Sequence, residues 1–236
     1  MAFRDRLVAT IRGAQAVLEV PDVLVVGSEV PNLIEPDAAA TLVVSLDLDV
    51  GVPIHRHDEV KDRLAALAAF APSPDEPSVF TPRSGDLLEL NFVGIDPAQD
   101  PESAYALADE RLPLMVFGPL SLVRPGREVD VGGVRVRVPR VAGLVLEKLV
   151  TDRTGEKGER DLLVALGLLT MAGAADLDEL ATAYLALSAE LRHAVRSNLT
   201  LLSLLDPRPG LPDPGPWRAG VAALLRRLER EDGSAP

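Results

Sequence analysis

Hydrophobic residues in the first half of the chain follow the spacing of β-strands, interrupted by two amphipathic helices. The apolar run from Val23 to Val26 is typical of a strand buried on both faces. Around Gly132 and Gly133, alternating valines predict a hairpin. The strands expected from these patterns are residues 23–26, 41–50, 87–95 and the hairpin 128–138, and the expected helices are 3–18 and 58–70.

After Pro139 the apolar positions change to helical spacing, with glycine or proline between successive segments. The predicted helices are residues 142–151, 157–171, 176–188, 190–205 and 217–230. This change of pattern predicts an α+β protein, with a mixed β-sheet in the N-terminal half and a helical C-terminal half. We expect one domain at residues 1–140 and a helical domain at 141–236 that closes one side of a cleft.

Composition predicts a folded, soluble protein. Of the 236 residues, 47% are apolar and 25% are charged, close to the average for globular proteins. The longest uncharged stretch of the second half, residues 162–175, is well short of the roughly 20 residues of a membrane-spanning helix, so we expect no membrane segment. The N-terminus shows no secretion signal and the chain has no cysteine, so a cytoplasmic location is the simplest expectation.

The net charge of -12 and the aromatic content of 3% limit the possible partners. Broad DNA binding needs excess lysine and arginine, and readers of single strands need rings that stack on bases, so we expect neither. Chemistry on phosphate would therefore take place in a local site, with a divalent metal ion offsetting carboxylates. Lysine is scarce among the 24 basic residues, yet Lys148 and Lys157 lie in one segment, which indicates positions where a compact ammonium group is preferred.

Two aspartates on one predicted strand are the main candidates for a metal site. Because side chains alternate along a strand, Asp47 and Asp49 should project from one face, about 6.6 Å apart at the backbone. The other face would be filled by Leu46, Leu48 and Val50. Mg2+ prefers such oxygen ligands and can complete its octahedron with triphosphate oxygens. The alternative is an edge strand with a solvated polar face.

Two further features could complete this site. Gly27 and Ser28 follow a predicted strand, where backbone N–H groups and a hydroxyl can hold phosphate. A tight turn with Ser28 as an ordinary helix N-cap is the alternative. Glu89 shares a strand face with Asn91 and could bind the same metal ion or take the proton of an attacking hydroxyl, unless it is simply a solvated glutamate.

The order of these parts resembles the nucleotidyltransferase fold of the polymerase-beta type. In the second half, segment 144–149, Arg153, Lys157 and segment 161–163 look like the helical "Lys-Leu, Arg, Lys-Asp-x-x-Asp" pattern of the abortive-infection type IV toxin nucleotidyltransferases. The resemblance covers roughly residues 20–170. It implies a Gly-Ser turn that binds triphosphate, an aspartate pair that holds magnesium, and helical residues that contact nucleotide phosphate or orient the site. The residues that would take these roles are Gly27, Ser28, Asp47, Asp49, Lys148, Arg153, Lys157 and Asp161.

The sequence departs from this family pattern in both halves. The gap between Ser28 and Asp47 is longer than in the family, and Pro31 interrupts the helix expected after the turn. The helical motif also lacks one acid. If Lys157 matches the family lysine, the next residue is glycine instead of aspartate. If Asp161 matches instead, a valine stands where the later aspartate should be. Ordinary surface salt bridges along a helix hairpin would also explain the charged residues here.

The leading hypothesis is a magnesium-dependent enzyme that moves a nucleotidyl group from a nucleoside triphosphate, such as ATP, to an acceptor hydroxyl. Asp47 and Asp49 would hold the metal ion, and Glu89 would join them or activate the acceptor. Lys148 and Arg153 would steady the leaving pyrophosphate. The alternative is a catalytically inactive member that kept the fold as a binding or regulatory module.

The acceptor is left open among protein, RNA and small molecules, and a protein partner is possible. The toxin resemblance implies transfer RNA as the acceptor and a role in a toxin–antitoxin pair. The net charge opposes RNA binding unless Arg135, Arg137 and Arg140 form a local basic patch.

Overall fold

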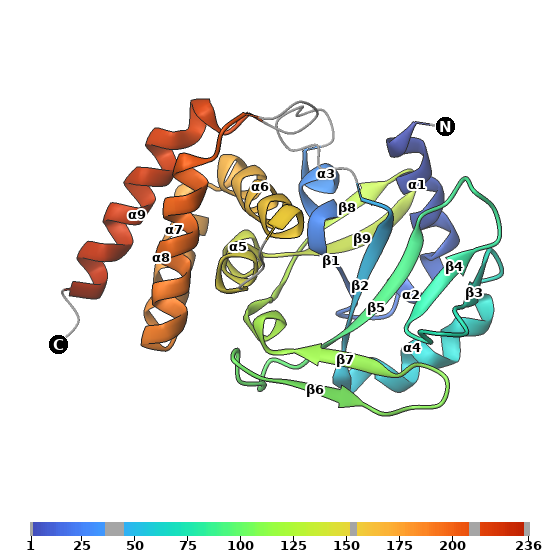
Figure 1. Cartoon of the computed structure of the whole chain (residues 1–236). Coiled ribbons are helices and arrows are strands. Elements are labelled where there is room, and N and C mark those ends of the chain that lie inside the picture. The colour runs from blue at the N-terminus through green and yellow to red at the C-terminus, as the bar shows by residue number, and fades with distance from the viewer. Residues whose placement is uncertain (1, 36–44, 152–154, 208–212, 234–236) are drawn as a thin grey trace.

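The predicted order of a sheet followed by helices is present in the structure, a computed structural model that describes residues 2–35, 45–151, 155–207 and 213–233 (Figure 1). The strands are β1 Leu24–Val26, β2 Asp47–Pro53, β3 Phe70–Pro72, β4 Val79–Pro82, β5 Glu89–Ile95, β6 Ala104–Leu107, β7 Leu114–Phe117, β8 Pro125–Val131 and β9 Val134–Pro139. The α-helices are α1 Phe3–Gly13, α2 Gln15–Leu18, α3 Val30–Ile34, α4 His57–Arg63, α5 Val141–Val150, α6 Gly155–Met171, α7 Ala174–Leu185, α8 Ala189–Leu204 and α9 Arg218–Gly233. The fold is α+β, as predicted.

Strand β5 organises the main sheet, which has seven strands. One of its edges pairs in parallel with β2, and β1 pairs antiparallel with the far edge of β2. Its other edge is shared by two partners: β4 pairs antiparallel near its start, and β7 pairs in parallel at Gly94. Strands β3 and β6 pair with β4 and β7 respectively. The sheet is therefore mixed, and residues at one level of β2 and β5 share a face.

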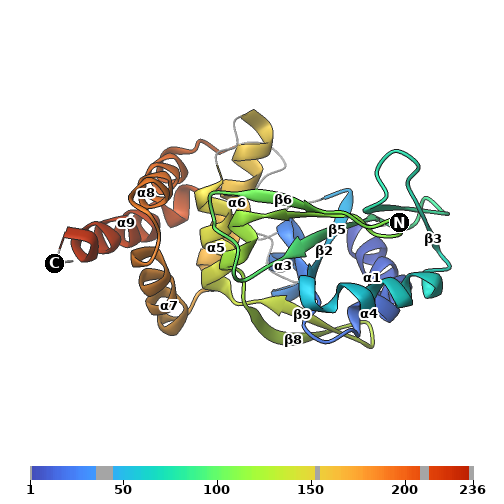
Figure 2. The same cartoon turned by 90° about the horizontal axis from the view of Figure 1, so that it is seen from below.

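Helices pack on both sides of β2 and β5. On one side lie α1 and α4, and on the other lie α5 and α6 (Figure 2). Alternate residues of the two strands are buried on the α1 side: Leu48, Val50, Leu90 and Phe92. The Thr10 hydroxyl accepts a hydrogen bond from the Leu88 N–H at 2.8 Å, which fixes α1 against the start of β5. These four side chains belong to the hydrophobic core, and Asp47, Asp49 and Asn91 lie on the opposite face of the two strands.

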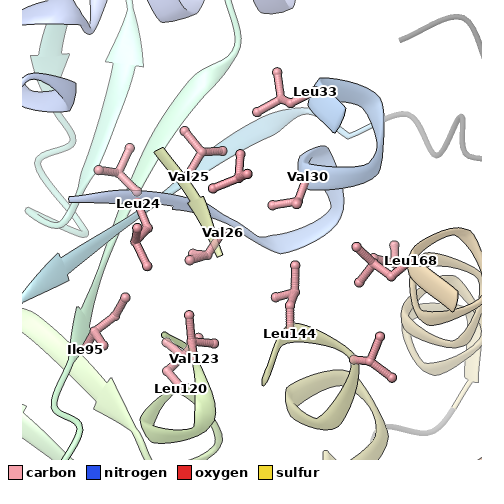
Figure 3. Close-up of a cluster of buried hydrophobic side chains, with 14 of the residues drawn as sticks. Leu24, Val25, Val26, Val30, Leu33, Ile95, Leu120, Val123, Leu144 and Leu168 are labelled. Carbon is pink, nitrogen blue, oxygen red and sulfur yellow. The ribbon is translucent and has the colours of Figure 1, made fainter. Parts of the chain in front are cut away.

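The same hydrophobic core continues from the sheet to the C-terminal helices, and Figure 3 shows this part of it. This part of the core contains Leu24 and Val26 from β1, Ile95 from β5, Leu144 from α5 and Leu168 from α6. Apolar burial of this kind fixes the position of α5 and α6 relative to the strands. The division into domains at 1–140 and 141–236 stays a prediction.

The structure corrects several of the predicted elements. The helix expected at 58–70 ends earlier, because a 3-10 turn at Leu64–Ala66 follows α4 and Phe70 begins β3. Strands β3, β4, β6 and β7 were not predicted, and each has only three or four residues, too few to show a period. Of the strand expected at 41–50, residues 41–44 lie outside the described residues, and β2 continues to Pro53. Leu46 precedes β2 and is 75% exposed, so it does not fill the buried face as predicted.

The hairpin and the C-terminal helices agree with the sequence pattern. Strands β8 and β9 turn at Gly132 and Gly133, both of which have positive φ, as a two-residue hairpin turn requires. Within the part of the chain that is described, we find no helix with the length and apolar character needed to cross a membrane.

Candidate active site

A cavity of about 820 Å³ lies between the open face of the sheet and helices α5 and α6. It brings together most of the residues that the sequence selected, although they come from distant parts of the chain. The predicted site residues that line it are Gly27, Ser28, Asp47, Asp49, Glu89, Lys148 and Asp161. Arg153 and the side chain of Lys157 lie outside the described residues.

The aspartate pair lies on one face of β2, as predicted. Asp47 and Asp49 are half-buried at the cavity, whereas Leu48 between them is buried in the core on the other face. Asn91 on β5, directly across from Asp49, donates a hydrogen bond of 2.8 Å to its Oδ1. The Ser45 hydroxyl donates to Oδ1 of Asp47. Both carboxylates are therefore held by neighbouring side chains, one in the sheet and one just before β2, which pre-organises them to bind a cation.

The turn after β1 is built around Asp49. Gly27 has φ +83°, and a Cβ atom placed on it would lie 2.2 Å from Oδ2 of Asp49. Only glycine allows the backbone to approach the carboxylate so closely. Pro31 does not interrupt the following helix, which corrects our expectation: it lies in the first turn of α3, where a missing N–H is tolerated. The turn thus places Ser28 beside the aspartate pair at the cavity wall.

Burial increases the proton affinity of the Asp49 carboxylate. It raises the pKa of Asp49 to about 6, and the negative charge of Asp47 adds to this rise. The hydrogen bond from Asn91 and the positive charge of Lys148 lower the pKa of Asp49 without cancelling the rise. Two neighbouring carboxylates in such a site are costly without a cation.

Glu29 is a further carboxyl near the aspartate pair, and we did not predict it. Its side chain is 1% exposed and accepts hydrogen bonds from Ser28 Oγ at 3.4 Å and Asn32 Nδ2 at 3.3 Å. Burial is the main reason that its pKa rises to about 8, and the charges of Asp47 and Asp49 contribute. At neutral pH Glu29 is therefore mostly protonated, so it does not repel an anion at the adjacent turn. The sequence did contain a signal for Glu29, because an acidic residue directly after a turn that is expected to bind phosphate is out of place unless it is protonated.

Lys148 lies on the opposite wall, at the end of α5. Its side chain is 7% exposed, and Nζ is 3.1 Å from Glu147 Oε2 and 3.5 Å from Asp161 Oδ1. This burial excludes the alternative that Lys148 belongs to a solvated surface salt bridge. Glu147, which the sequence analysis did not select, lines the same cavity and is also buried. The ammonium group thus links α5 to α6 at the cavity.

Glu89 is next to the aspartate pair but is more exposed to solvent than either aspartate. It pairs with Asp47 across β2 and β5, so it shares their face, and it is exposed at the cavity edge. Among the described residues, no three histidine, cysteine, aspartate or glutamate side chains are close enough together to hold one metal ion. Two hard carboxylates beside a cavity still match what Mg2+ needs from a protein when triphosphate and water supply its other ligands.

Comparison with known proteins tests the fold. No known protein family matches the sequence, and a comparison with curated proteins finds no match. Among solved structures, an antigenic nucleotidyltransferase-like protein from Paracoccidioides brasiliensis superposes with a TM-score of 0.51 at 14% identity, over 94% of this chain and 93% of that one. The fold is that of a nucleotidyltransferase. The antibiotic-resistance factor ANT(2'')-Ia gives a TM-score of 0.43 at 16% identity, over 84% of this chain and 95% of that one, a superposition too loose to add to this result.

The nucleotidyltransferase fold here carries no uncompensated basic patch at the three arginines considered for RNA. Arg137 is paired with Glu128 at 2.6 Å and with Asp22 at 3.4 Å. Arg135 lies 3.9 Å from Glu128, and Arg140 lies 3.4 Å from a carboxylate of α7. Each positive charge is offset by a neighbouring acid, which weakens the case for RNA as a partner.

Proposed function

We propose that this protein transfers a nucleotidyl group from a nucleoside triphosphate to an acceptor hydroxyl, with magnesium as cofactor. The observation that supports this most strongly is the placement of Asp47 and Asp49 opposite Lys148 in one cavity of a nucleotidyltransferase fold. Carboxylates for a metal ion and a buried cation for phosphate are the two charges that such a reaction needs.

Each residue has a distinct role in the proposed reaction. Asp47 and Asp49 hold the magnesium ion, which offsets the charge of the triphosphate when it is bound. The N–H groups of the turn at Gly27 and the Ser28 hydroxyl contact the triphosphate. Lys148 meets the pyrophosphate from the helical wall, with Arg153, Lys157 and Asp161 as the further candidates from the resemblance.

The proposed reaction is a displacement at the α-phosphorus of the triphosphate. The oxygen of the acceptor hydroxyl forms a bond to the α-phosphorus, and the bond from that phosphorus to the oxygen bridging the β-phosphate breaks. The electron pair of that bond leaves with pyrophosphate. Glu89 is exposed at the cavity edge and accepts the hydroxyl proton.

The decisive experiment measures binding of a nonhydrolysable triphosphate by isothermal titration with and without magnesium. In Asp47→Asn with Asp49→Asn, magnesium-dependent binding should be lost while the fold is kept, because both carboxylates at the metal site are gone. Removing two neighbouring like charges should also raise the melting temperature of the apoprotein. Binding as tight as that of the wild type would place the metal site elsewhere.

A matched control has the same change of charge outside the cavity. Asp75→Asn with Asp86→Asn alters two exposed aspartates that do not line it. This variant should bind the magnesium complex within about twofold of the wild type, as expected for surface substitutions. Equal losses in both double variants would indicate a general charge effect and would contradict the assigned site.

The second candidate is a catalytically inactive module that binds nucleotide. The missing acid of the helical motif favours it, because glycine occupies position 158 and valine occupies position 164. Incubation with labelled triphosphates, magnesium and cell extract separates the two, since only an enzyme transfers label to protein, RNA or a small molecule. The likeness to abortive-infection toxins and the cytoplasmic location remain predictions.

A further inference from the structure

The floor of the cavity changes from polar to apolar along the sheet. At its β2 end the face carries the aspartates and Asn91. Further along, Val93 of β5 and then Met115 and Phe117 of β7 line the same cavity. These three side chains share a face because Gly94 pairs with Val116, so the odd-numbered residues on each side point the same way. We call Val93, Met115 and Phe117 the apolar shelf.

The apolar shelf is open, which is unusual for such large side chains. Met115 is 42% exposed and Phe117 is 44% exposed. On β6 the residues paired with them are Ala106 and Ala104, which are also exposed and too small to cover them. An exposed apolar surface inside a binding cavity marks a place where a ligand buries its own apolar face.

We propose that the apolar shelf binds the acceptor, and that the acceptor is a small hydroxyl compound with an apolar or aromatic face and no phosphate groups. This inference rests on the proposed nucleotidyl transfer. Its basis is the order of strands across the sheet, the in-line geometry of the reaction and the charge of the cavity lining.

Strand order decides which substrate lies on the apolar shelf. The turn with Ser28 follows β1, and β7 lies at the opposite side of β2 and β5. In Figure 1, α3 after that turn lies near the upper ends of these strands and β7 lies near their lower ends. Attacking and leaving oxygens lie roughly in line on opposite sides of the phosphorus. With pyrophosphate at the turn, the attacking hydroxyl must come from the β7 side, past Val93 and Asn91 of β5.

The charge of the lining decides the class of acceptor. Its acids are Asp47, Asp49, Glu76, Glu89, Glu147 and Asp161, and its bases are Lys148 and Arg160. The acids outnumber the bases, and Glu76 and Glu89 are exposed at the cavity. A polyanion such as RNA would meet like charge here, whereas a neutral or cationic compound would not.

The test uses tyramine, a phenol with an ammonium group, as the probe. Its affinity is measured by ligand-observed NMR with magnesium and a nonhydrolysable triphosphate present. Met115→Ala with Phe117→Ala should weaken tyramine binding about fivefold or more, because aromatic packing on the apolar shelf is lost. The same variant should bind the triphosphate within about twofold of the wild type.

A matched control truncates two other exposed apolar side chains. Leu201 and Leu204 of α8 are 52% and 68% exposed and do not line the cavity. Leu201→Ala with Leu204→Ala should leave tyramine binding unchanged. Met115→Gln, a single polar substitution at an exposed position, repeats the test if the double variant folds poorly.

Several results would overturn the inference. These are no tyramine binding to the wild type, equal losses of triphosphate and tyramine in the shelf variant, or tighter binding of ribose 5-phosphate or single-stranded RNA than of tyramine. Failure of the proposed function gives a different pattern, in which the wild type does not bind the magnesium–triphosphate complex but still binds tyramine through Phe117.

Discussion

The two walls of the cavity are held in place by different forces. On the sheet wall, the ladders between β1, β2 and β5 set the positions of Asp49 and Asn91. On the helical wall, Lys148 is held by charge, between Glu147 and Asp161. The sheet wall should therefore be sensitive to changes of backbone space, and the helical wall to changes of charge.

Removal of the charge of Lys148 should have the largest effect. Lys148→Met removes the ammonium group beside the buried Glu147 and the partly buried Asp161, and breaking a buried ion pair typically costs about 3–5 kcal/mol of unfolding free energy. If Lys148 also meets phosphate, triphosphate affinity should fall about 10- to 150-fold. Chemical denaturation and isothermal titration measure the two effects. Adding Glu147→Gln should restore part of the stability, because one unpaired charge is removed.

Lys61 provides the control for this prediction. Its Nζ also contacts two carboxylates, Asp109 at 2.6 Å and Asp58 at 2.7 Å, and it lies outside the cavity. Lys61→Met should reduce stability without changing triphosphate affinity. Unchanged affinity in Lys148→Met would remove the helical wall from the site.

Addition of one carbon to the sheet wall should have the next largest effect. Gly27→Ala forces a Cβ atom against Oδ2 of Asp49, and Gly133→Ala, at φ +90°, meets no atom within 4 Å. Both variants carry the strain of a positive φ, of order 1 kcal/mol. Gly27→Ala should lose roughly 2 kcal/mol more in thermal unfolding, together with its magnesium-dependent triphosphate binding. Equal behaviour of the two variants would contradict the close approach at Asp49.

A smaller effect is expected when the charge of a carboxyl group on the sheet wall is removed without a change in its size. Burial raises the pKa of Glu29 to about 8 from 4.5, so the folded state holds this proton more tightly than the unfolded state. Between these two pH values the unfolded state binds fewer protons, and stability falls as pH rises. Glu29→Gln keeps the shape of the protonated side chain and should remove part of this fall.

Melting temperature against pH measures this difference. One pKa unit corresponds to about 1.4 kcal/mol, or about 3–6 °C in a chain of this size. Even one unit of the rise should therefore make Glu29→Gln melt about 3–6 °C above the wild type at pH 9, with the two close together at pH 5. Glu19→Gln, on a glutamate that is exposed, should follow the wild type. Parallel curves for wild type and Glu29→Gln would show that Glu29 has no raised proton affinity.

The sequence predicted those parts of the site that follow from local spacing. Asp47 and Asp49 were found because side chains alternate along a strand, and Glu89 because it follows the same rule on another strand. Glu29 was missed because its burial depends on α3 and the sheet, which no local pattern describes. Glu147 was missed because neighbouring residues on a helix do not normally face each other, yet it lies 3.1 Å from Lys148.

The fold was predicted best where the elements are long. The hairpin at β8 and β9 and the helices after Pro139 have enough residues to show their period. Strand β7 has four residues, of which Met115 and Phe117 are exposed and Leu114 and Val116 are buried, so the sequence shows only a short apolar run. The apolar shelf therefore could not be predicted from the sequence, because it depends on the pairing of β7 with β5, which places it beside the aspartates.

The β6–β7 hairpin, which carries part of the cavity floor, is attached to the sheet at one end of β5. The hairpin of β6 and β7 joins β5 at Gly94 and Val116, beyond the stretch where β5 pairs with β4. Asp47 and Glu89 take their register from a different edge of that strand. Replacement of the hairpin should therefore leave the carboxylates in place. If the proposed roles hold, acceptor preference and phosphate chemistry can be engineered, or can diverge in evolution, independently of each other.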